Sequence, residues 1–427
     1  MRGHLLQNTV MALVSVVLGV LISGCPADRL HSPTPKSPHL VPDDGVVELV
    51  ESAPIETTLD HPDVPNASDV WVTMIDRAKA TIDFAEFYAS EAEPPYRAHE
   101  KLEPVIAAIE RAVNRAVRVR FLADSIFAPK YPDTLKRLEA IGVTVKILHE
   151  DQLAGGVLHA KYFVVDGKES YLGSQNFDWR ALSHIQEMGV RSTSPKITGA
   201  LLDVFDTDWA IANGGAKTDR TKSRGRGQLV PMAHGEKVTF VASPKGWLPD
   251  EAEWDLPQIV GLLDNARTRI DVQVLQYKTK DRSGEPFLVL DQALRRAAGR
   301  GVAVHLLVSH WNVNPGSDGL AAVTDLAKVP NVEVRVITIP KWSGGEIPFA
   351  RVAHAKYLVV DNARAWVGTS NWEGDYFTKS RNVGVIVESG YLPTRLAGVF
   401  TSGWTSEYAT ALGAGAAPPS GSGPSPR

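Results

Sequence analysis

A nine-residue segment occurs twice in this chain of 427 residues, and the second copy keeps the spacing of the first. Residues 158–166 read LHAKYFVVD and residues 353–361 read AHAKYLVVD, so each contains His-x-Lys and, after four further residues, Asp. Gly-Ser-Gln-Asn at 173–176 and Gly-Thr-Ser-Asn at 368–371 follow, with every position shifted by 195 residues. One such match has a chance on the order of one in ten thousand per starting position. The repeat therefore predicts an internal duplication in which each copy carries half of one site.

Side-chain direction separates the residues of each copy into two groups. Alternate residues of a strand face the same side, so His159 and Lys161 project together. Asp166 lies seven positions after the histidine, an odd offset, and faces the other way in a regular strand. We therefore expect the histidine, the lysine and the later asparagine at the reacting group, and the aspartate as a support at the strand end. The candidate catalytic residues are His159, Lys161, Asp166 and Asn176 in the first copy, and His354, Lys356, Asp361 and Asn371 in the second.

The residue types indicate phosphodiester chemistry. Two imidazoles with ordinary pKa values of roughly 6.5 can share the roles of nucleophile and general acid. Two lysines and two amides supply donors for the non-bridging oxygens of a phosphoryl group. This set requires no metal ion and no organic cofactor. An isolated histidine at the start of an apolar strand is more often a hydrogen-bonded core residue. Lysine is almost never buried without a partner, so the doubled pair favours an anion site over packing.

The doubled pattern resembles the signature of the phospholipase D superfamily, which is His-x-Lys-x4-Asp followed by Gly-Ser/Thr-x-Asn. The flanking residues at 156–159, 171–182 and 368–377 are similar to the branch that contains the mammalian endolysosomal phospholipase-D-like exonucleases. The resemblance runs from about residue 68 to about residue 408. It implies an α/β fold of two tandem α/β/α sandwich domains, a pseudo-dimer with one active site at the interface. It also implies an enzyme that works through a covalent phosphohistidine, with Ser174 and Thr369 in contact with the substrate.

One difference between the copies distinguishes the two histidines. Glu187 follows the first-copy asparagine by eleven residues, whereas the equivalent position 195 residues later is Asn382. In the resembled family, a carboxylate in this region can hydrogen-bond the catalytic histidine. We therefore expect Glu187 to hold His159 and raise its basicity, which makes His159 the nucleophile and His354 the general acid. The alternative is that Glu187 is a strand residue at the surface.

The amino terminus is typical of an exported lipoprotein. An apolar run from Val10 to Ile22 follows a basic start and ends in Ile-Ser-Gly-Cys, which resembles a bacterial lipobox with Cys25 as the lipidated first residue. The run is short for a membrane-spanning helix; an ordinary signal peptide or an uncleaved anchor is the alternative. Cys25 is the only cysteine, which excludes an intramolecular disulfide. We expect a cell-envelope lipoprotein on the periplasmic face of the inner or the outer membrane.

Composition divides the chain into six parts. A proline-rich stretch follows the cysteine, and a basic stretch between the halves is typical of a solvated linker or of an anion-attracting rim. The basic residues are Lys217, Arg220, Lys222, Arg224 and Arg226. The expected parts are a lipoprotein signal peptide (1–25), a spacer (26–66), a first phospholipase-D-like domain (67–212), a linker (213–237), a second domain (238–410) and a disordered tail (411–427). Expected helices cover 67–80, 98–116, 255–266 and 286–299. Expected strands cover 81–87, 118–123, 144–148, 159–165, 269–277, 302–308, 332–337 and 354–360, with shorter strands near 171, 189–191, 366 and 383–387.

The substrate remains open between three interpretations. Anchorage beside phospholipids favours a lipid-active phosphodiesterase, either a phospholipase D or a phosphatidyltransferase like cardiolipin synthase. The flanking residues favour an exonuclease on single-stranded DNA or RNA. A net charge of −4 argues weakly against binding of extended duplex, but an enzyme that holds only a strand end needs less charge and can use aromatic stacking. A non-catalytic envelope lipoprotein is the third interpretation, which the completeness of both copies disfavours. No obligatory protein partner is expected.

Overall fold

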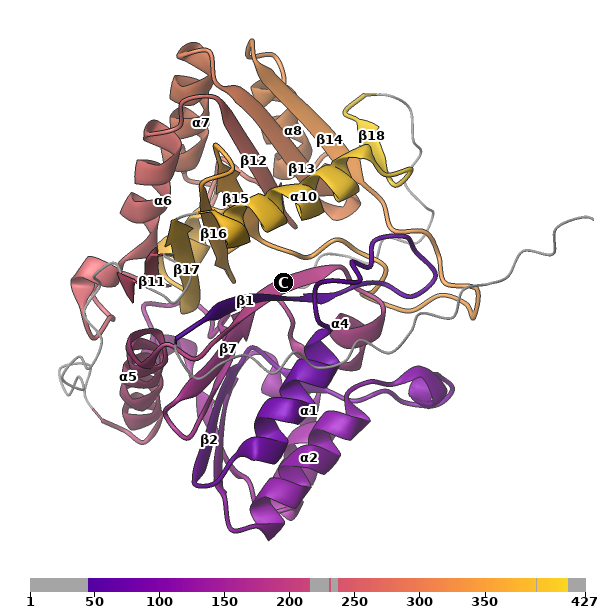
Figure 1. Cartoon of the computed structure of the whole chain (residues 1–427), viewed down its shortest axis with the longest axis vertical. Coiled ribbons are helices and arrows are strands. Elements are labelled where there is room, and N and C mark those ends of the chain that lie inside the picture. Colours follow the sequence, from indigo (N-terminus) through magenta and orange to yellow (C-terminus); the bar gives the residue numbers. More distant parts are fainter. Residues whose placement is uncertain (1–44, 216–229, 232–236, 389, 414–427) are drawn as a thin grey trace, which may run out of the picture. The chain divides into compact units, whose positions relative to one another are not determined.

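Two mixed β-sheets, one from each half of the sequence, form the framework of the protein (Figure 1). The computed structural model describes residues 45–215, 230–231, 237–388 and 390–413. In the first sheet β2, β4 and β5 run parallel, and the remaining strands pair in antiparallel fashion. The strand order is β1 (Val47–Ser52), β9 (Glu187–Ser192), β7 (Glu169–Gly173), β6 (Lys161–Val165), β2 (Thr81–Glu86), β4 (Arg118–Asp124) and β5 (Thr144–Leu148).

The second sheet repeats this plan with additional edge strands. Strands β12, β13 and β14 run parallel, and the others pair in antiparallel fashion. The order is β10 (Val230–Pro231), β11 (Lys237–Ser243), β17 (Asn382–Glu388), β16 (Arg364–Gly368), β15 (Tyr357–Val360), β12 (Arg269–Val274), β13 (Ala303–Ser309), β14 (Val332–Ile337) and β18 (Ala409–Ala411). The short strands β3 (Ala89–Ser90) and β8 (Phe177–Asp178) form a separate pair. The signature strand of each half, β6 or β15, therefore lies between a parallel and an antiparallel part of its sheet.

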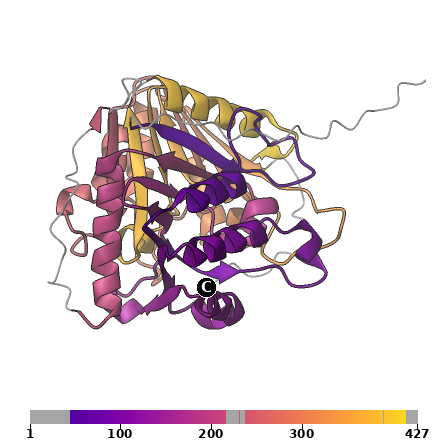
Figure 2. The ribbon, with the colours of Figure 1, turned by 60° about the horizontal axis from the view of Figure 1, so that its bottom comes forward.

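Helices cover both sheets, in agreement with the expected α/β sandwiches. Figures 1 and 2 show α1 (Ala67–Arg77) and α2 (Glu103–Asn114) side by side against the first sheet, where they contact each other. In α1, Trp71, Met74 and Ile75 share one buried face because they are three and four residues apart. The other helices are α3 (Pro132–Ala140), α4 (Trp179–Ser183), α5 (Pro195–Ala212), α6 (Asp255–Asp264), α7 (Val289–Gly299), α8 (Asp318–Leu326), α9 (Gly374–Thr378) and α10 (Tyr391–Thr405). Short 3-10 turns span Tyr96–His99, Ala128–Lys130, Glu150–Gln152, Glu251–Glu253 and His310–Val313.

Every expected helix and strand is present, although some ends differ by several residues. Four helices of nine residues or more, α3, α5, α8 and α10, were not among the expected elements. For α5 the start signal is readable, because Ser194 accepts from the N–H of Ile197 and Pro195 occupies the first turn. Its periodicity is weak, because α5 packs against β5 and β7 of its own half and also against β11 of the other half. Burial on two sides removes the polar face on which a period-based prediction depends.

The expected spacer is too long, because residues 47–66 belong to the folded body. Strand β1 pairs with β9 from Val47 opposite Ser192 to Ser52 opposite Glu187. Beyond the strand, Leu59 and Val64 are also buried. The apolar run of β1 is only six residues long and follows a proline-rich stretch, so it gives a weak strand signal. Two smaller corrections concern β10, which lies inside the expected linker, and β18, which extends into the expected tail.

One of the hydrophobic clusters is shared by the two halves. A single cluster of buried side chains includes Val164 and Phe205 from the first half and Tyr357 and Phe400 from the second. Helix α10 of the second half contacts β1, and α5 of the first half contacts β11, so a helix of each half packs against a strand of the other. The interface therefore buries apolar surface in the way that a domain core does, and the described residues all belong to one compact unit.

The expected lipidation site, Cys25, lies outside the described residues. Within the described ranges, no helix has both the length and the apolar character that crossing a bilayer requires.

Candidate active site

Both signature histidines lie immediately before a buried strand. His159 precedes β6 by two residues and His354 precedes β15 by three. Their backbone N–H groups donate across the boundary between the halves: that of His159 to the carbonyl of Arg381 (2.9 Å) and that of His354 to the carbonyl of Gln186 (2.8 Å). The expected strands began at the histidines themselves. They begin later because the backbone here bonds to the opposite half rather than to a neighbour in its own sheet.

The cross-half contacts follow the internal repeat. One isolated parallel bridge joins Leu158 to Arg381, and another joins Gln186 to Ala353. A shift of 195 residues converts position 158 into 353 and position 186 into 381. The two bridges are thus the same contact made twice, as a two-fold relationship between the halves requires. The signature segments meet at this interface, which confirms the expected pseudo-dimer.

The side-chain partners of the histidines are also exchanged between the halves. The Nδ1 atom of His354 lies 2.9 and 2.8 Å from the two carboxylate oxygens of Glu187. The Nδ1 atom of His159 lies 2.9 Å from Oδ1 of Asn382. The expectation that Glu187 holds His159 is therefore wrong. Glu187 is also not a surface residue, because its side chain is fully buried. The error arose from assigning the partner within one half, whereas the two-fold relationship sends it to the other.

These contacts determine which imidazole nitrogen faces the substrate. Burial raises the pKa of Glu187 to about 8, against the effect of Lys356. Once ionised, its carboxylate only accepts hydrogen bonds and then requires the proton of His354 on Nδ1. The amide of Asn382 is oriented by its own nitrogen, which donates to the carbonyl of Tyr376 (2.7 Å), so its oxygen accepts from Nδ1 of His159. Burial lowers the pKa of both imidazoles well below the usual range, and Lys161 and Lys356 act in the same direction. Both rings are then neutral, and each presents an unprotonated Nε2.

The two lysines are fully buried beside the histidines. The Nζ atom of Lys161 donates to the carbonyl of His159, and that of Lys356 donates to the carbonyl of His354. Burial lowers the pKa of Lys161 well below its usual range and that of Lys356 to about 7, the latter against the effect of Glu187. A bound phosphate would favour the protonated amines again, since a nearby negative charge stabilises a cation. The buried pair therefore suits a site for an anion.

Both signature asparagines reach the same cavity as the histidines. Asn176 and Asn371 line it, and within the described part of the chain the buried Oδ1 atom of each has no hydrogen-bond partner. Unpaired buried polar atoms are uncommon and costly. Their position indicates amide groups held for a ligand, to which an asparagine can offer Oδ1 as an acceptor and Nδ2 as a donor.

The signature hydroxyls do not reach the cavity. Ser174 is fully buried, and its Oγ bonds to the backbone of Met188 (3.1 Å) as well as to Glu187. Thr369 is also fully buried, and its Oγ1 donates to Oδ1 of Asn382 (2.9 Å). The expectation that these residues contact the substrate is corrected. Ser174 hydrogen-bonds Glu187, the partner of His354. Thr369 hydrogen-bonds Asn382, the partner of His159.

The signature aspartates support the strand ends, as expected. Asp166 accepts hydrogen bonds from the backbone N–H groups of residues 79–81 at 2.7–2.9 Å, and Asp361 accepts from those of residues 267–269 at 2.8–3.3 Å. Both have positive φ angles, 52° and 55°, which fits a tight turn after the strand. A wide groove of about 1020 Å³ lies beside Asp166, but it contains neither histidine and neither lysine of the site.

The signature histidines and asparagines line a small cavity of about 80 Å³, to which both halves contribute residues. The ring of His159 lies between two aromatic rings, with centroids 4.9 Å from Phe87 and 4.6 Å from Tyr376. Further aromatic residues on the cavity wall are Tyr88, Phe127, Trp311 and Phe349. The cavity is much smaller than the roughly 300–1,000 Å³ of pockets that enclose a drug-sized ligand, so it accommodates the reacting end of a larger molecule.

Several site residues were not predicted in their present roles. Asn382 was noted as the counterpart of Glu187, and the repeat could have revealed it as a histidine partner. Glu86 ends β2 opposite Lys161 and is fully buried; burial raises the pKa of its carboxyl well above the usual range, against the effect of Lys161. A charged residue at the end of an apolar strand was the available signal. Tyr376 and Arg282 also line the cavity.

No group of three or more histidine, cysteine or acidic side chains in the described ranges is arranged to hold a metal ion.

The family profile described as "Cardiolipin synthase, PLD-like domain" matches the chain twice, at residues 71–209 and 259–404. The chain is 31% identical over 399 residues to 5'-3' exonuclease PLD3 of Bos taurus, which covers 86% of this chain and 81% of that protein. It is 29% identical over 392 residues to phospholipase D Z of Dictyostelium discoideum, covering 85% and 90%. The fold is similar to that of phosphatidylserine synthase of Haemophilus influenzae, with a TM-score of 0.56, 12% identity, and coverage of 81% of this chain and 85% of that one.

The matched residues include both signatures, and the structure brings the histidine and the asparagine of each signature to one cavity. The chain therefore belongs to the phospholipase D superfamily, near the branch of the PLD3 and PLD4 exonucleases, and is a phosphodiesterase built from two tandem domains.

Proposed function

We propose that this phosphodiesterase removes nucleotides from the end of a single-stranded nucleic acid through a covalent phosphohistidine. The observation that carries the proposal is the cavity of about 80 Å³, with two histidines on an aromatic wall. Nucleobases stack on aromatic side chains whatever their sequence. A cavity this small admits little more than the reacting phosphodiester, so the adjoining nucleosides would lie against the aromatic residues of its wall. Relatives named 5'-3' exonuclease in Bos taurus and Mus musculus support this choice.

We assign the role of nucleophile to His354, because a carboxylate partner makes an imidazole more basic. This reverses the assignment expected from the sequence, since Glu187 holds His354 (2.8 Å) and not His159. Nε2 of His354 attacks phosphorus, the bond from phosphorus to the leaving oxygen breaks, and protonated His159 donates its proton to that oxygen. His159 then accepts a proton from water as the water attacks phosphorus. The P–N bond breaks, which regenerates neutral His354.

The substrate itself supplies the protonation state that this mechanism needs. In the empty site, burial and the two lysines lower the pKa of His159. A bound phosphodiester brings one negative charge, which opposes the effect of the lysines and raises the pKa of His159. The lysines and the two asparagines would donate to the non-bridging oxygens, where charge accumulates in the transition state. His159 thus becomes a proton donor mainly when a substrate is present.

A phospholipid is the second candidate substrate, and it was the first expectation from the sequence. It is supported by the lipobox-like segment that ends at Cys25, which would hold the enzyme at a membrane surface on the periplasmic side. Relatives named phospholipase D in Dictyostelium discoideum and probable phospholipase D in Caenorhabditis elegans also support it. Only the head-group end of a lipid fits a cavity of about 80 Å³, so the acyl chains would stay in the bilayer.

One parallel assay distinguishes the two substrates. A soluble form of the protein that lacks residues 1–25 is incubated with 5'-labelled and 3'-labelled single-stranded DNA and with vesicles of phosphatidylcholine and phosphatidylglycerol. Bis(p-nitrophenyl) phosphate serves as the control for an active preparation. Stepwise shortening of the DNA from one end supports the proposal, whereas release of head groups with intact DNA would assign the enzyme to lipids. The His354→Asn variant must abolish whichever activity is seen.

A further inference from the structure

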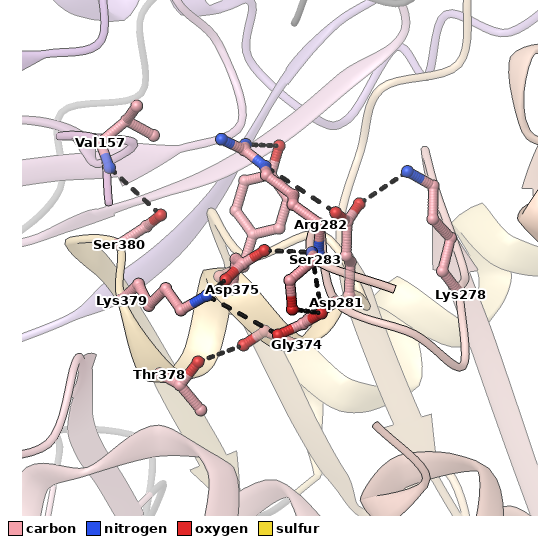
Figure 3. Close-up of polar contacts among 12 residues, drawn as sticks. Val157, Lys278, Asp281, Arg282, Ser283, Gly374, Asp375, Thr378, Lys379 and Ser380 are labelled. Atoms are coloured by element: carbon pink, nitrogen blue, oxygen red, sulfur yellow. Dashed lines mark hydrogen bonds and ion pairs between the residues drawn. The ribbon is translucent and has the colours of Figure 1, made fainter. Parts of the chain in front are cut away.

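One arginine projects into the cavity from the loop between β12 and α7. Among the described residues that line the cavity, Arg282 is the only lysine or arginine. Its side chain is 46% exposed, so it borders both the cavity and solvent. The loop faces α9 of the same half, as Figure 3 shows for Asp281, Arg282 and Ser283 on one side and Asp375 and Lys379 on the other. The reaction described above does not use this residue.

The backbone of the loop is firmly held. The N–H of Arg282 donates to Oδ2 of Asp375 (2.7 Å). Asp281 accepts from both the N–H and the hydroxyl of Ser283, at 2.9 and 2.6 Å. Lys379 then joins the two acidic residues, with Nζ 2.6 Å from Asp375 and 3.7 Å from Asp281 (Figure 3). These contacts fix the backbone of Arg282 beside the cavity without any ligand.

The guanidinium of Arg282, in contrast, makes only long contacts. Within the described part of the chain, its Nε lies 3.8 Å from Oε1 of Glu373 and its Nη2 lies 3.5 Å from the hydroxyl of Tyr376. Glu373 has a closer partner, since its Oε2 lies 2.9 Å from Nζ of Lys278. An arginine offers five N–H donors in a planar fork that matches a phosphate. Most of that capacity is unused, so the fixed loop presents a group suited to an anion.

Tyr376 contacts both Arg282 and His159, and these contacts show where Arg282 lies relative to the reacting groups. The guanidinium lies over one part of the tyrosine ring, with Cζ 5.5 Å from the centroid. The ring of His159 meets the same tyrosine edge to face at 4.6 Å. A single aromatic ring thus separates Arg282 from the histidine that protonates the leaving oxygen. Arg282 is therefore on the side from which the remaining strand departs.

We propose that Arg282 binds the first phosphate of the leaving strand, one nucleotide away from the scissile phosphodiester. This inference rests on the proposed function, because it requires a substrate with a second phosphodiester. A phospholipid such as phosphatidylcholine has only one phosphodiester, and so does a dinucleoside monophosphate. The contact would align the leaving oxygen with His159 and would make the enzyme faster on chains of three nucleotides than on chains of two.

The test compares two oligonucleotides that differ by one phosphodiester. kcat/KM is measured for thymidylyl-thymidine, with one phosphodiester, and for the trinucleotide with two. Arg282→Gln should lose about tenfold more on the trinucleotide than on the dinucleotide, since it removes a charge-assisted hydrogen bond that only the longer substrate makes. Arg282→Lys should recover part of the loss. On the trinucleotide, the dependence of log kcat/KM on log salt should become shallower by about 0.7 for one lost phosphate contact on a single strand.

Lys280→Gln is the matched control, because it removes one charge from the same loop at a side chain that is 50% exposed and pairs with Asp318. It should leave both rates within about twofold of the parent enzyme, as expected for an exposed ion pair. Equal losses on both substrates in Arg282→Gln would overturn the inference, as would no loss on either. If the parent enzyme cleaves bis(p-nitrophenyl) phosphate but no oligonucleotide, the proposed function fails and the inference fails with it.

Discussion

Glu187 of the first half lies 2.8 Å from Nδ1 of His354 in the second half, and no carboxylate occupies the equivalent position beside His159. The repeat places Asn382 there instead, 2.9 Å from the ring. A site assembled from two copies of one motif therefore has two different histidine environments. This difference is the basis of the separate roles that we propose for the two histidines, because an ionised carboxylate favours a cationic ring and an amide does so far less.

The first prediction concerns these roles. A substrate with a very good leaving group needs no acid, so on a p-nitrophenyl phosphodiester His159→Asn should still form the phosphoenzyme. His354→Asn should not, because the attacking nitrogen is lost. On oligonucleotides or lipids both variants should lose several orders of magnitude in turnover. Trapping the phosphoenzyme after rapid acid quench provides the measurement, and label retained only in His354→Asn would return the nucleophile to His159.

The second prediction concerns pH. Burial and two lysines lower the pKa of His159 in the free enzyme, and an acid works only when protonated. kcat/KM should therefore decrease as pH rises, with the descent below the ordinary imidazole value of roughly 6.5. Asn382→Asp places a carboxylate on Nδ1 of His159, which raises the pKa of the ring and should shift the descent to higher pH. A pH profile identical to that of the parent would show that His159 does not supply the proton.

Much of the site could be predicted because its residues are close in sequence. The spacing of His159, Lys161 and Asn176 places the first two at the start of one strand and the asparagine in the turn after the next strand, and the repeat supplies the second set. The partner of each histidine could not be predicted in the same way, because it comes from the opposite half. The exchange follows from the two-fold relationship, since the isolated bridges from Gln186 to Ala353 and from Leu158 to Arg381 are copies of each other.

In the fold, too, the elements that depend on contacts with distant parts of the chain could not be predicted from local sequence. Helices such as α1, with one apolar face, and strands such as β5 were predicted closely because local periodicity determines them. Helices α5 and α10 were not, because contact with the other half buries part of the surface that would otherwise be polar. Strand β1 was assigned to the spacer because its six residues become a strand only when β9 is beside them.

The third prediction concerns the joint between the halves. Asp208 of α5 and Arg381 form an ion pair in which both side chains are fully buried, with contacts of 2.7 and 2.8 Å. Arg381 also donates to the carbonyls of Ser243 and Trp247 (2.8 Å each). Asp208→Asn leaves a buried guanidinium without its counter-charge, which should lower the free energy of unfolding by roughly 3–5 kcal/mol. Urea denaturation provides the measurement.

The control for that measurement is Asp264→Asn, which removes an ion pair to Arg296 in which the two side chains are 39% and 49% exposed. Such pairs contribute little because solvent screens them. A similar midpoint for Asp208→Asn and Asp264→Asn would mean that the interface does not depend on the buried pair. Loss of activity in Asp208→Asn is also expected, because the backbone of Arg381 holds that of His159.

The fourth prediction concerns the amino terminus. If Cys25 is the lipidated first residue, Cys25→Ser should block lipid attachment and leave either an unprocessed precursor or a protein released from the membrane. Metabolic labelling with a fatty acid, together with membrane fractionation, measures both effects. Unchanged processing and unchanged membrane association in Cys25→Ser would contradict a lipoprotein and would favour the ordinary signal peptide or the uncleaved anchor.

The last prediction is that one site depends on both lysines at once. Lys161 and Lys356 are each fully buried beside the histidine of their own half, and each lowers the pKa of both histidines. Lys161→Ala and Lys356→Ala should each reduce kcat/KM strongly, because each removes a cation from the same phosphoryl oxygens. The double variant should lose less than the product of the two single losses, since residues that act as a unit are not additive. Two separate sites would instead give each single variant about half of the parent rate and the double variant none, and a first-half fragment ending near residue 213 would then keep activity by itself.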